Sequence, residues 1–191
     1  MLKFIRTFSA IVLVSFLAAC SPAPSGEIEI TEVRIPMPDG VRLAADIYWP
    51  ADRAGTQRFP VLLEYLPYRK DESRAGSYSK YSYFIDHGYA VARVDIRGTG
   101  NSEGVTIPYE YSDIELDDGE AVIDWLASQD WSTGNVGMFG ISWGGFNSIQ
   151  MAMRNPPALK AFVSLMATES LYLEDVHYID RKSTRLNSSH H

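Results

Sequence analysis

The sequence predicts an α/β fold, in which a largely parallel sheet is covered by helices on both faces. Short apolar runs typical of buried strands alternate along the chain with segments of helical spacing, and this alternation is typical of such sheets. Two segments near the start alternate between apolar and polar side chains and predict a hairpin. The apolar run that begins at Val136 enters a helix through a Gly-x-Ser-x-Gly sequence centred on Ser142, around which the rest is organised.

The elements follow from apolar periodicity and turn residues. The predicted strands are Glu27–Ile35, Val41–Trp49, Phe59–Tyr65, Tyr89–Asp95, the run from Val136 and Leu159–Met166. The predicted helices are Tyr78–Asp86, one opened by Asp117–Glu120 and one that follows Ser142 and stops before Asn155. Met37–Gly40 supplies the hairpin turn, and Gly88 suits the left-handed position after a helix.

Side-chain patterns also predict how the helices pack. Early acids in Asp117–Glu120 complement the helix dipole and are expected to be solvated, and their spacing matches no cation-binding loop. His87 is expected to favour the negative end of its helix, which is a structural role. In the helix after Ser142, the predicted apolar face consists of Phe146, Ile149, Ala152 and Met153.

The Gly-x-Ser-x-Gly sequence indicates a nucleophile elbow, because it joins a strand to a helix through a sharp turn with a central serine. Gly140 and Gly144 are expected to let the strand and the helix approach without Cβ clashes. The helix N-terminus favours negative charge where a substrate oxyanion would form. The alternative is a glycine-rich turn with an incidental serine, but the flanking pattern favours a catalytic Ser142.

The N-terminal segment predicts a secretory signal. Residues 1–20 hold two basic side chains and then an apolar core, Phe8 to Leu17, which is shorter than the roughly 20 residues of a spanning helix. The Leu-Ala-Ala-Cys that ends at Cys20 resembles a bacterial lipobox, in which the cysteine is lipidated. We therefore expect Cys20 to anchor the protein in the bacterial cell envelope, on the periplasmic or extracellular face, with residues 21–26 as a linker. The alternative is an ordinary signal peptide.

The C-terminal segment fits no element that precedes it. Residues 180–191 resemble the translation of a common sequencing-library adapter, the alternative being a natural polar tail or a tag remnant. We expect the natural protein to continue past Ile179, so that residues 27–179 form the N-terminal part of a larger domain.

Charge and cysteine content exclude several classes of function. Between residues 21 and 179, acidic side chains outnumber basic ones by 23 to 12, and the lack of a basic stripe argues against binding to nucleic acid. Cys20 is the only cysteine, which excludes a disulfide framework. No motif indicates a metal or an organic cofactor, and the oligomeric state stays open.

With these residues placed, the chain resembles the cocaine-esterase/X-Pro dipeptidyl-peptidase group of α/β-hydrolases, also called CocE/NonD hydrolases. The similarity covers nearly all of residues 30–178. The segments that carry it are Asp39–Leu43, Pro67–Lys70, Asp95–Gly98, Glu120–Gln129, Asn135–Met138 and Gly140–Gly145.

This resemblance implies an incomplete α/β-hydrolase fold that lacks its later strands, its cap and a C-terminal β-sandwich. It implies that Ser142 attacks the carbonyl of a small ester, an amide or a short peptide and forms an acyl-enzyme. The backbone N–H of Trp143 would bind the oxyanion. The Tyr68 hydroxyl would complete this oxyanion hole, the alternative being an aromatic packed at a strand end.

In such hydrolases the triad residues follow one another in the order Ser, acid, His. Asp175 and His177 follow Ser142 too closely in the sequence to supply the acid and the histidine. We therefore expect residues 1–191 alone to be inactive and their unfinished sheet to expose an edge. Esterase, dipeptidyl-peptidase and β-lactam acylase activities are not separable from these residues. The alternative function is that of a lipid-anchored protein that keeps the fold but binds a partner without catalysis.

Overall fold

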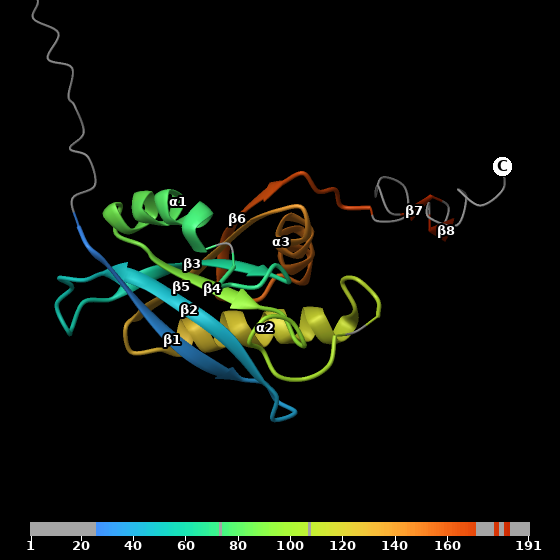
Figure 1. Ribbon diagram of the computed structural model, residues 1–191, viewed down its shortest axis with the longest axis horizontal. Coiled ribbons are helices and arrows are strands. Elements are labelled where there is room, and N and C mark those ends of the chain that lie inside the picture. Colours follow the sequence, from blue (N-terminus) through green and yellow to red (C-terminus); the bar gives the residue numbers. More distant parts are fainter. Residues whose placement is uncertain (1–25, 73, 107, 171–177, 180–181, 184–191) are drawn as a thin grey trace, which may run out of the picture.

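A six-stranded sheet in the order β1-β2-β4-β3-β5-β6 forms the centre of the computed structural model (Figure 1). The structure describes residues 26–72, 74–106, 108–170, 178–179 and 182–183. The strands of the sheet are β1 (Ile28–Pro36), β2 (Arg42–Pro50), β3 (Phe59–Leu66), β4 (Ala90–Asp95), β5 (Ser132–Ile141) and β6 (Leu159–Leu165). The helices are α1 (Arg74–Asp86), α2 (Asp113–Ser128) and α3 (Trp143–Arg154), and β7 (Tyr178–Ile179) pairs separately with β8 (Lys182–Ser183).

The sheet is mixed at one side and parallel at the other. β1 and β2 form the predicted antiparallel hairpin, and β2 pairs antiparallel with β4. β4, β3, β5 and β6 then pair parallel, with β3 between β4 and β5. The predicted α/β fold is therefore confirmed, and the carboxyl ends of β3, β4 and β5 lie at the same edge of the sheet.

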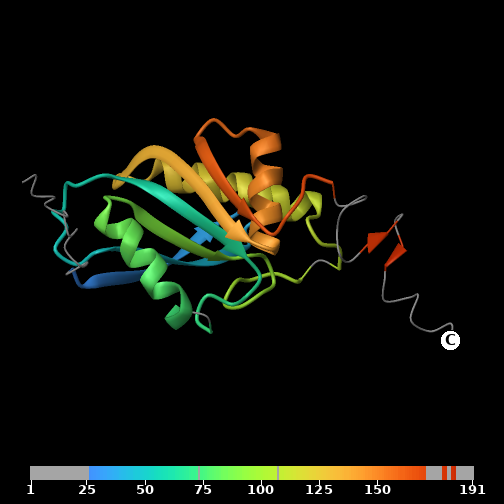
Figure 2. The same ribbon diagram turned by 90° about the horizontal axis from the view of Figure 1, so that it is seen from above.

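Helices cover both faces of the sheet (Figure 2). α2 and α3 lie on one face, over the larger core, to which α2 contributes Val122, Ile123 and Leu126. α1 lies on the opposite face, where Tyr81 and Ile85 pack against side chains of β2, β4 and β5. As expected, Gly88 ends α1 with a φ of +84°.

Two predictions about α2, its first residue and the exposure of Asp118, are wrong. α2 begins at Asp113 rather than at Asp117, because the side chain of Ser112 caps it by accepting the N–H of Glu115. Asp118 therefore lies inside the helix, 3% exposed, and not at a solvated start.

The apolar face predicted for α3 is only partly right. Phe146 is buried, but Met153 is 70% exposed. The buried face of α3 is made mainly of small or polar residues, namely Gly144, Gly145, Asn147 and Ser148, and Met151 is its other apolar member. The helix approaches the sheet so closely that small side chains, rather than the apolar period, decide which face is buried.

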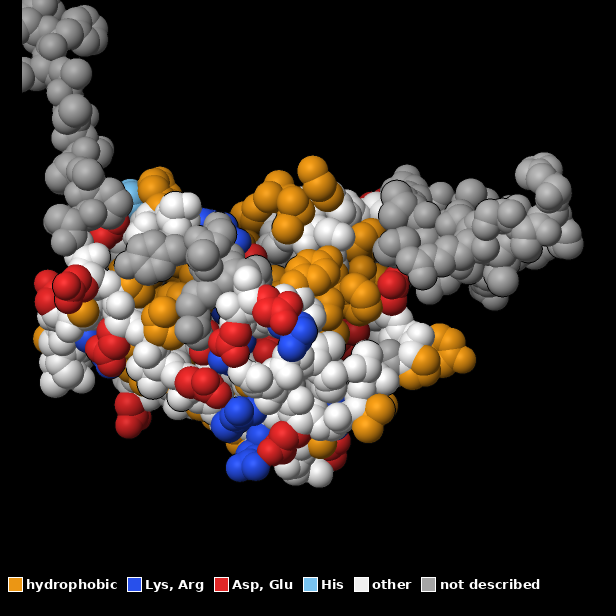
Figure 3. Space-filling model, viewed as in Figure 1, with side chains coloured by type: hydrophobic (Ala, Val, Ile, Leu, Met, Phe, Trp, Pro, Cys, Tyr) orange, Lys and Arg blue, Asp and Glu red, His pale blue; other side chains and the backbone are white. Residues whose placement is uncertain are grey.

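β6 forms one edge of the sheet and is poorly covered in the part of the chain that the structure describes. Phe162, Val163 and Leu165 are each about half exposed. Figure 3 shows hydrophobic side chains gathered on this face over β6 and α3.

No helix among the described residues has the length and apolar character needed to span a membrane. The predicted signal, Cys20, Asp175 and His177 lie outside the described residues.

Candidate active site

Ser142 lies at the turn between β5 and α3, with φ 55° and ψ −119°, a backbone conformation that residues other than glycine rarely adopt. Its N–H donates to the carbonyl of Leu165 over 2.9 Å, and its own carbonyl accepts the N–H of Phe146 over 2.9 Å at the start of α3. The residue is exposed. The predicted strand–turn–helix geometry is confirmed, and the catalytic role of the serine stays a prediction.

The two glycines of the motif differ in how closely they are packed. A Cβ on Gly140 would lie 2.6 Å from the Cα of Gly144 and closer still to its carbonyl carbon. The atoms nearest to a Cβ on Gly144 would be the carbonyl oxygen of Tyr65 at 3.7 Å and side-chain atoms of Leu66 at 3.9 Å, which are ordinary contacts. The expected steric need therefore holds for Gly140 and not for Gly144. Gly145 is the second tight position, because a Cβ added there would lie 2.6 Å from the carbonyl oxygen of Leu165.

Tyr68 follows β3, the strand beside β5, and its ring is 44% exposed. Its hydroxyl oxygen accepts the backbone N–H of Trp143 over 3.3 Å. Tyr68 and Trp143, both predicted from the family resemblance, are thus brought together beside Ser142. This place combines an exposed hydroxyl, which can act as a nucleophile, with a backbone N–H at a helix N-terminus and a phenol, which can donate hydrogen bonds to an oxyanion.

A buried carboxylate that the sequence analysis missed supports the elbow. Glu115, 5% exposed, accepts the indole N–H of Trp143 over 2.7 Å and the amide of Asn147 over 2.9 Å, both through Oε1. Its Oε2 accepts the backbone N–H of Tyr111 over 3.2 Å. Burial raises the pKa of Glu115, and the bonds from Trp143 and Asn147 act against that rise. The Ser-x-x-Glu spacing of Ser112 and Glu115, typical of a helix start, was the available signal.

The loop 97–104 after β4 is held to two other segments by Arg97. Arg97 donates to both carboxylate oxygens of the buried Asp118 over 2.7 Å and to the exposed Asp39 over 2.6 Å. These contacts tie the loop to α2 and to the hairpin turn, and they raise the pKa of Arg97.

The described residues supply no base for Ser142. His87 is the only histidine among them, and its Nδ1 lies 2.7 Å from the carbonyl oxygen of Tyr83, on the face of the sheet opposite α3. Its ring also packs against that of Tyr83, with centroids 4.2 Å apart, so its role is structural as predicted. Within the described residues, no group of three or more His, Cys, Asp or Glu side chains could hold a metal ion.

Comparison with known proteins gives consistent matches. The model of the X-Pro dipeptidyl-peptidase (S15) family matches residues 39–188. Cocaine esterase from Rhodococcus sp. (strain MB1 Bresler) is 40% identical over 144 residues, which cover 74% of this chain and 24% of the esterase. A putative Xaa-Pro dipeptidyl-peptidase from Streptomyces avermitilis is 31% identical over 163 residues, covering 69% of this chain and 24% of that protein.

Solved structures agree with these matches. A CocE/NonD family hydrolase from Staphylococcus aureus superimposes with a TM-score of 0.66 and 25% identity, covering 80% of this chain and 33% of that one. The chain spans about a quarter of the length of the curated relatives named above.

Proposed function

This chain belongs to the X-Pro dipeptidyl-peptidase (S15) family, and we propose that the whole protein hydrolyses ester or amide bonds with Ser142 as its nucleophile. The observation that carries this proposal is the strained backbone of Ser142 beside two oxyanion donors. One donor is the N–H of Trp143 and the other is the Tyr68 hydroxyl, 3.3 Å from it.

In the proposed reaction, the Ser142 oxygen bonds to the substrate carbonyl carbon while a base takes its proton. The carbonyl oxygen becomes an oxyanion, to which Trp143 donates its backbone N–H and Tyr68 its O–H. Collapse of this intermediate expels an alcohol or an amine, which receives the proton from the base. Water, activated by the same base, then releases the acid from the acyl-enzyme.

Trp143 and Tyr68 need only a small rearrangement to do this. Without substrate, the Trp143 N–H is directed at the phenol oxygen. An oxyanion between the two residues would accept a hydrogen bond from that N–H and a second one from the phenol O–H. Both donors are therefore arranged before the charge develops, which is the condition for stabilising a transition state more than the ground state.

We further propose that the catalytic acid and histidine lie beyond residue 179 in the natural protein. Residues 1–191 alone are then inactive, because a missing triad partner costs roughly 10⁴-fold in rate. Esters, amides or short peptides are the proposed substrates, in keeping with relatives named cocaine esterase and Xaa-Pro dipeptidyl-peptidase.

The experiment uses the full-length protein. Hydrolysis of p-nitrophenyl butyrate and of a dipeptidyl p-nitroanilide with proline at the second position is compared between wild type, Ser142→Ala and Ser128→Ala. Ser128 is an exposed serine at the end of α2 and is the matched control. We expect only Ser142→Ala to abolish turnover. A folded wild type with no turnover of either substrate would instead support a binding protein without catalysis.

Attachment to the membrane is a separate proposal. We propose that Cys20 is lipidated and holds the protein on the cell envelope, because its preceding residues resemble a lipobox. Expressed in a bacterium with its own leader, the wild type is expected in the membrane fraction. Cys20→Ser is expected in the aqueous fraction, and an unchanged distribution would contradict the anchor.

A further inference from the structure

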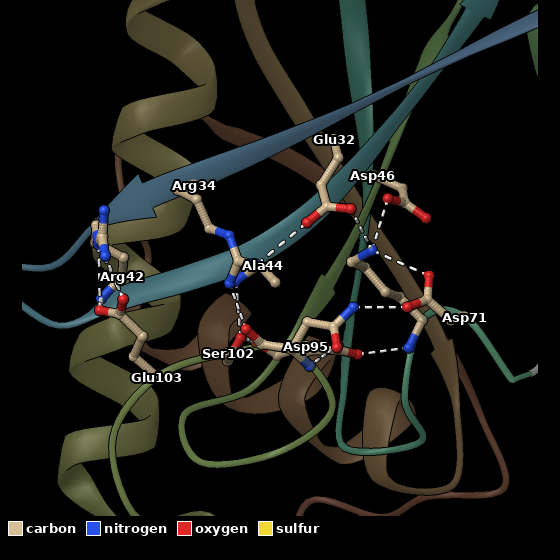
Figure 4. Close-up of polar contacts among 11 residues, drawn as sticks. Glu32, Arg34, Arg42, Ala44, Asp46, Asp71, Asp95, Ser102 and Glu103 are labelled. Atoms are coloured by element: carbon tan, nitrogen blue, oxygen red, sulfur yellow. Dashed lines mark hydrogen bonds and ion pairs between the residues drawn. The ribbon is translucent and has the colours of Figure 1, made fainter.

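The segment that carries Tyr68 is held by a lysine two residues later. The Lys70 side chain is fully buried, and its Nζ lies 2.9 Å from the equally buried carboxylate of Asp46, 3.1 Å from Asp71 and 3.4 Å from Glu32. Figure 4 shows the carboxylates of Glu32, Asp46 and Asp71 turned toward the same point. They come from β1, β2 and the loop after β3, so a single ammonium group joins this loop to the hairpin.

The backbone of the same residue is held as well. The N–H of Lys70 donates to one oxygen of Asp95 over 2.6 Å, and the N–H of Asn101 donates to the other over 3.0 Å. The side-chain amide of Asn101 also donates to the carboxylate of Asp71 over 2.6 Å. Asp95 is the last residue of β4 and is fully buried, so the loops after β3 and β4 share one rigid anchor.

Arg69, between Tyr68 and Lys70, has a φ of 61°. A residue with a Cβ adopts this left-handed conformation at a free-energy cost and keeps it only where its surroundings determine it. Here both neighbours are held: Lys70 by its buried contacts and Tyr68 by the N–H of Trp143. The strained residue therefore lies between a fixed anchor and the proposed oxyanion hole.

We propose that Lys70 is a positioning residue for catalysis: its ion pair with Asp46 holds the strained loop so that the Tyr68 hydroxyl stays beside the Trp143 N–H. This inference rests on the proposed function. A buried ion pair adds little net stability, because both charges lose their hydration. Its most direct contribution here is geometric, and a displacement of about 1 Å at a catalytic group is enough to cost roughly 10²-fold in rate.

A double-mutant cycle on the full-length protein separates this role from a merely structural one. Lys70→Met is expected to lower kcat by about tenfold or more with little change in KM, since the oxyanion forms after substrate binds. In a Tyr68→Phe background, the same substitution is expected to change kcat by less than about twofold, because the hydroxyl that it positions is already gone.

Two further variants complete the test. Lys80→Met is the matched control, because Lys80 also pairs with a buried carboxylate, that of Glu64 at 2.7 Å, but it comes from α1 and not from the loop that carries Tyr68. Asp46→Asn removes the partner charge and keeps its size, and it replaces Lys70→Met in the cycle if that variant does not fold.

The outcomes are distinct. Losses of kcat that multiply in the double variant would overturn the role of Lys70 and leave the proposed function standing. An unchanged kcat in Tyr68→Phe alone would instead overturn the role of Tyr68 in the proposed function. Equal losses of kcat in Lys70→Met and Lys80→Met would also remove Lys70 as a specific positioning residue.

Discussion

The backbone N–H of Trp143 donates a hydrogen bond to the Tyr68 hydroxyl over 3.3 Å, although the two residues lie 75 positions apart in the chain. Trp143 begins α3 directly after β5, and Tyr68 follows β3. Because β3 and β5 are parallel neighbours, their following loops leave the sheet at the same end. The sheet therefore brings the two proposed oxyanion donors together before any substrate is bound.

Tyr68→Phe tests the phenol directly, since it removes the hydroxyl and keeps the ring. We expect kcat of the full-length protein to fall roughly 10²- to 10³-fold, with KM little changed, because the oxyanion exists only after attack on the carbonyl. Steady-state hydrolysis of p-nitrophenyl butyrate measures both constants. Tyr83→Phe, at a ring 58% exposed on α1, is the control and is expected to keep full activity.

Gly140→Ala and Gly144→Ala are expected to differ in stability although they belong to the same motif. A Cβ at Gly140 would lie within 2.6 Å of backbone atoms of Gly144, so the strand or the helix must shift, and we expect a loss of about 1–3 kcal/mol or more. A Cβ at Gly144 makes ordinary contacts inside a helix, where alanine is the more favourable residue. Urea unfolding of both variants measures the difference, and equal losses would contradict the packing described for the elbow.

Arg97 is expected to matter for stability mainly through its buried partner. Arg97→Met leaves the carboxylate of Asp118 buried without its bidentate cation, and we expect a loss of roughly 3–5 kcal/mol. Asp39→Asn removes only the exposed end of the same network and is expected to cost much less. Chemical denaturation of the two variants provides the comparison. A larger loss for Asp39→Asn would mean that the exposed pair holds the loop.

Glu115→Gln is expected to change how stability depends on pH. Burial raises the folded-state pKa of Glu115 above its ordinary value of 4.5, so between the two values the folded chain binds the proton more tightly than the unfolded chain. The contribution of Glu115 to stability is therefore largest at low pH and falls as pH rises through the folded-state pKa. Glutamine cannot ionise, so the free energy of unfolding of the variant should rise relative to wild type across this window.

Unfolding at a series of pH values from 4 upward measures this difference. Asp39 and Glu103, whose pKa values are lowered by Arg97 and Arg42, give the opposite trend. They are present in both proteins and cancel in the comparison. If the free energy of unfolding of the variant relative to wild type stayed constant with pH, or fell as pH rises, burial would not be what sets the pKa of Glu115.

The sequence was sufficient where the structure depends on near neighbours. The hairpin, the alternating strands and the turn at Ser142 all arise from contacts within a few residues, so their patterns could be recognised. Gly140 shows the same principle, because its missing Cβ is required by Gly144, four positions later. The start of α2 was also predictable, since Ser112 and Glu115 have the spacing of a helix cap.

Contacts between distant segments could not be predicted in this way. The sequence pattern predicts a solvated Asp118, whereas the structure buries it against Arg97, which comes from another loop. Only the family resemblance predicts Tyr68 as a site residue, since the residues next to it in the sequence do not indicate a contact with Trp143. Lys70 was recognised only as part of a matching segment, and its burial against Asp46 is a property of the folded sheet.

The most direct test of the account is to map the serine that reacts with a fluorophosphonate. The full-length protein is incubated with the probe, digested and analysed by mass spectrometry, alongside Ser142→Ala. We predict one modified peptide, which contains Ser142, and no labelling of the folded alanine variant. Labelling at another serine, or equal labelling of Ser142→Ala, would contradict the assignment of Ser142 as the nucleophile.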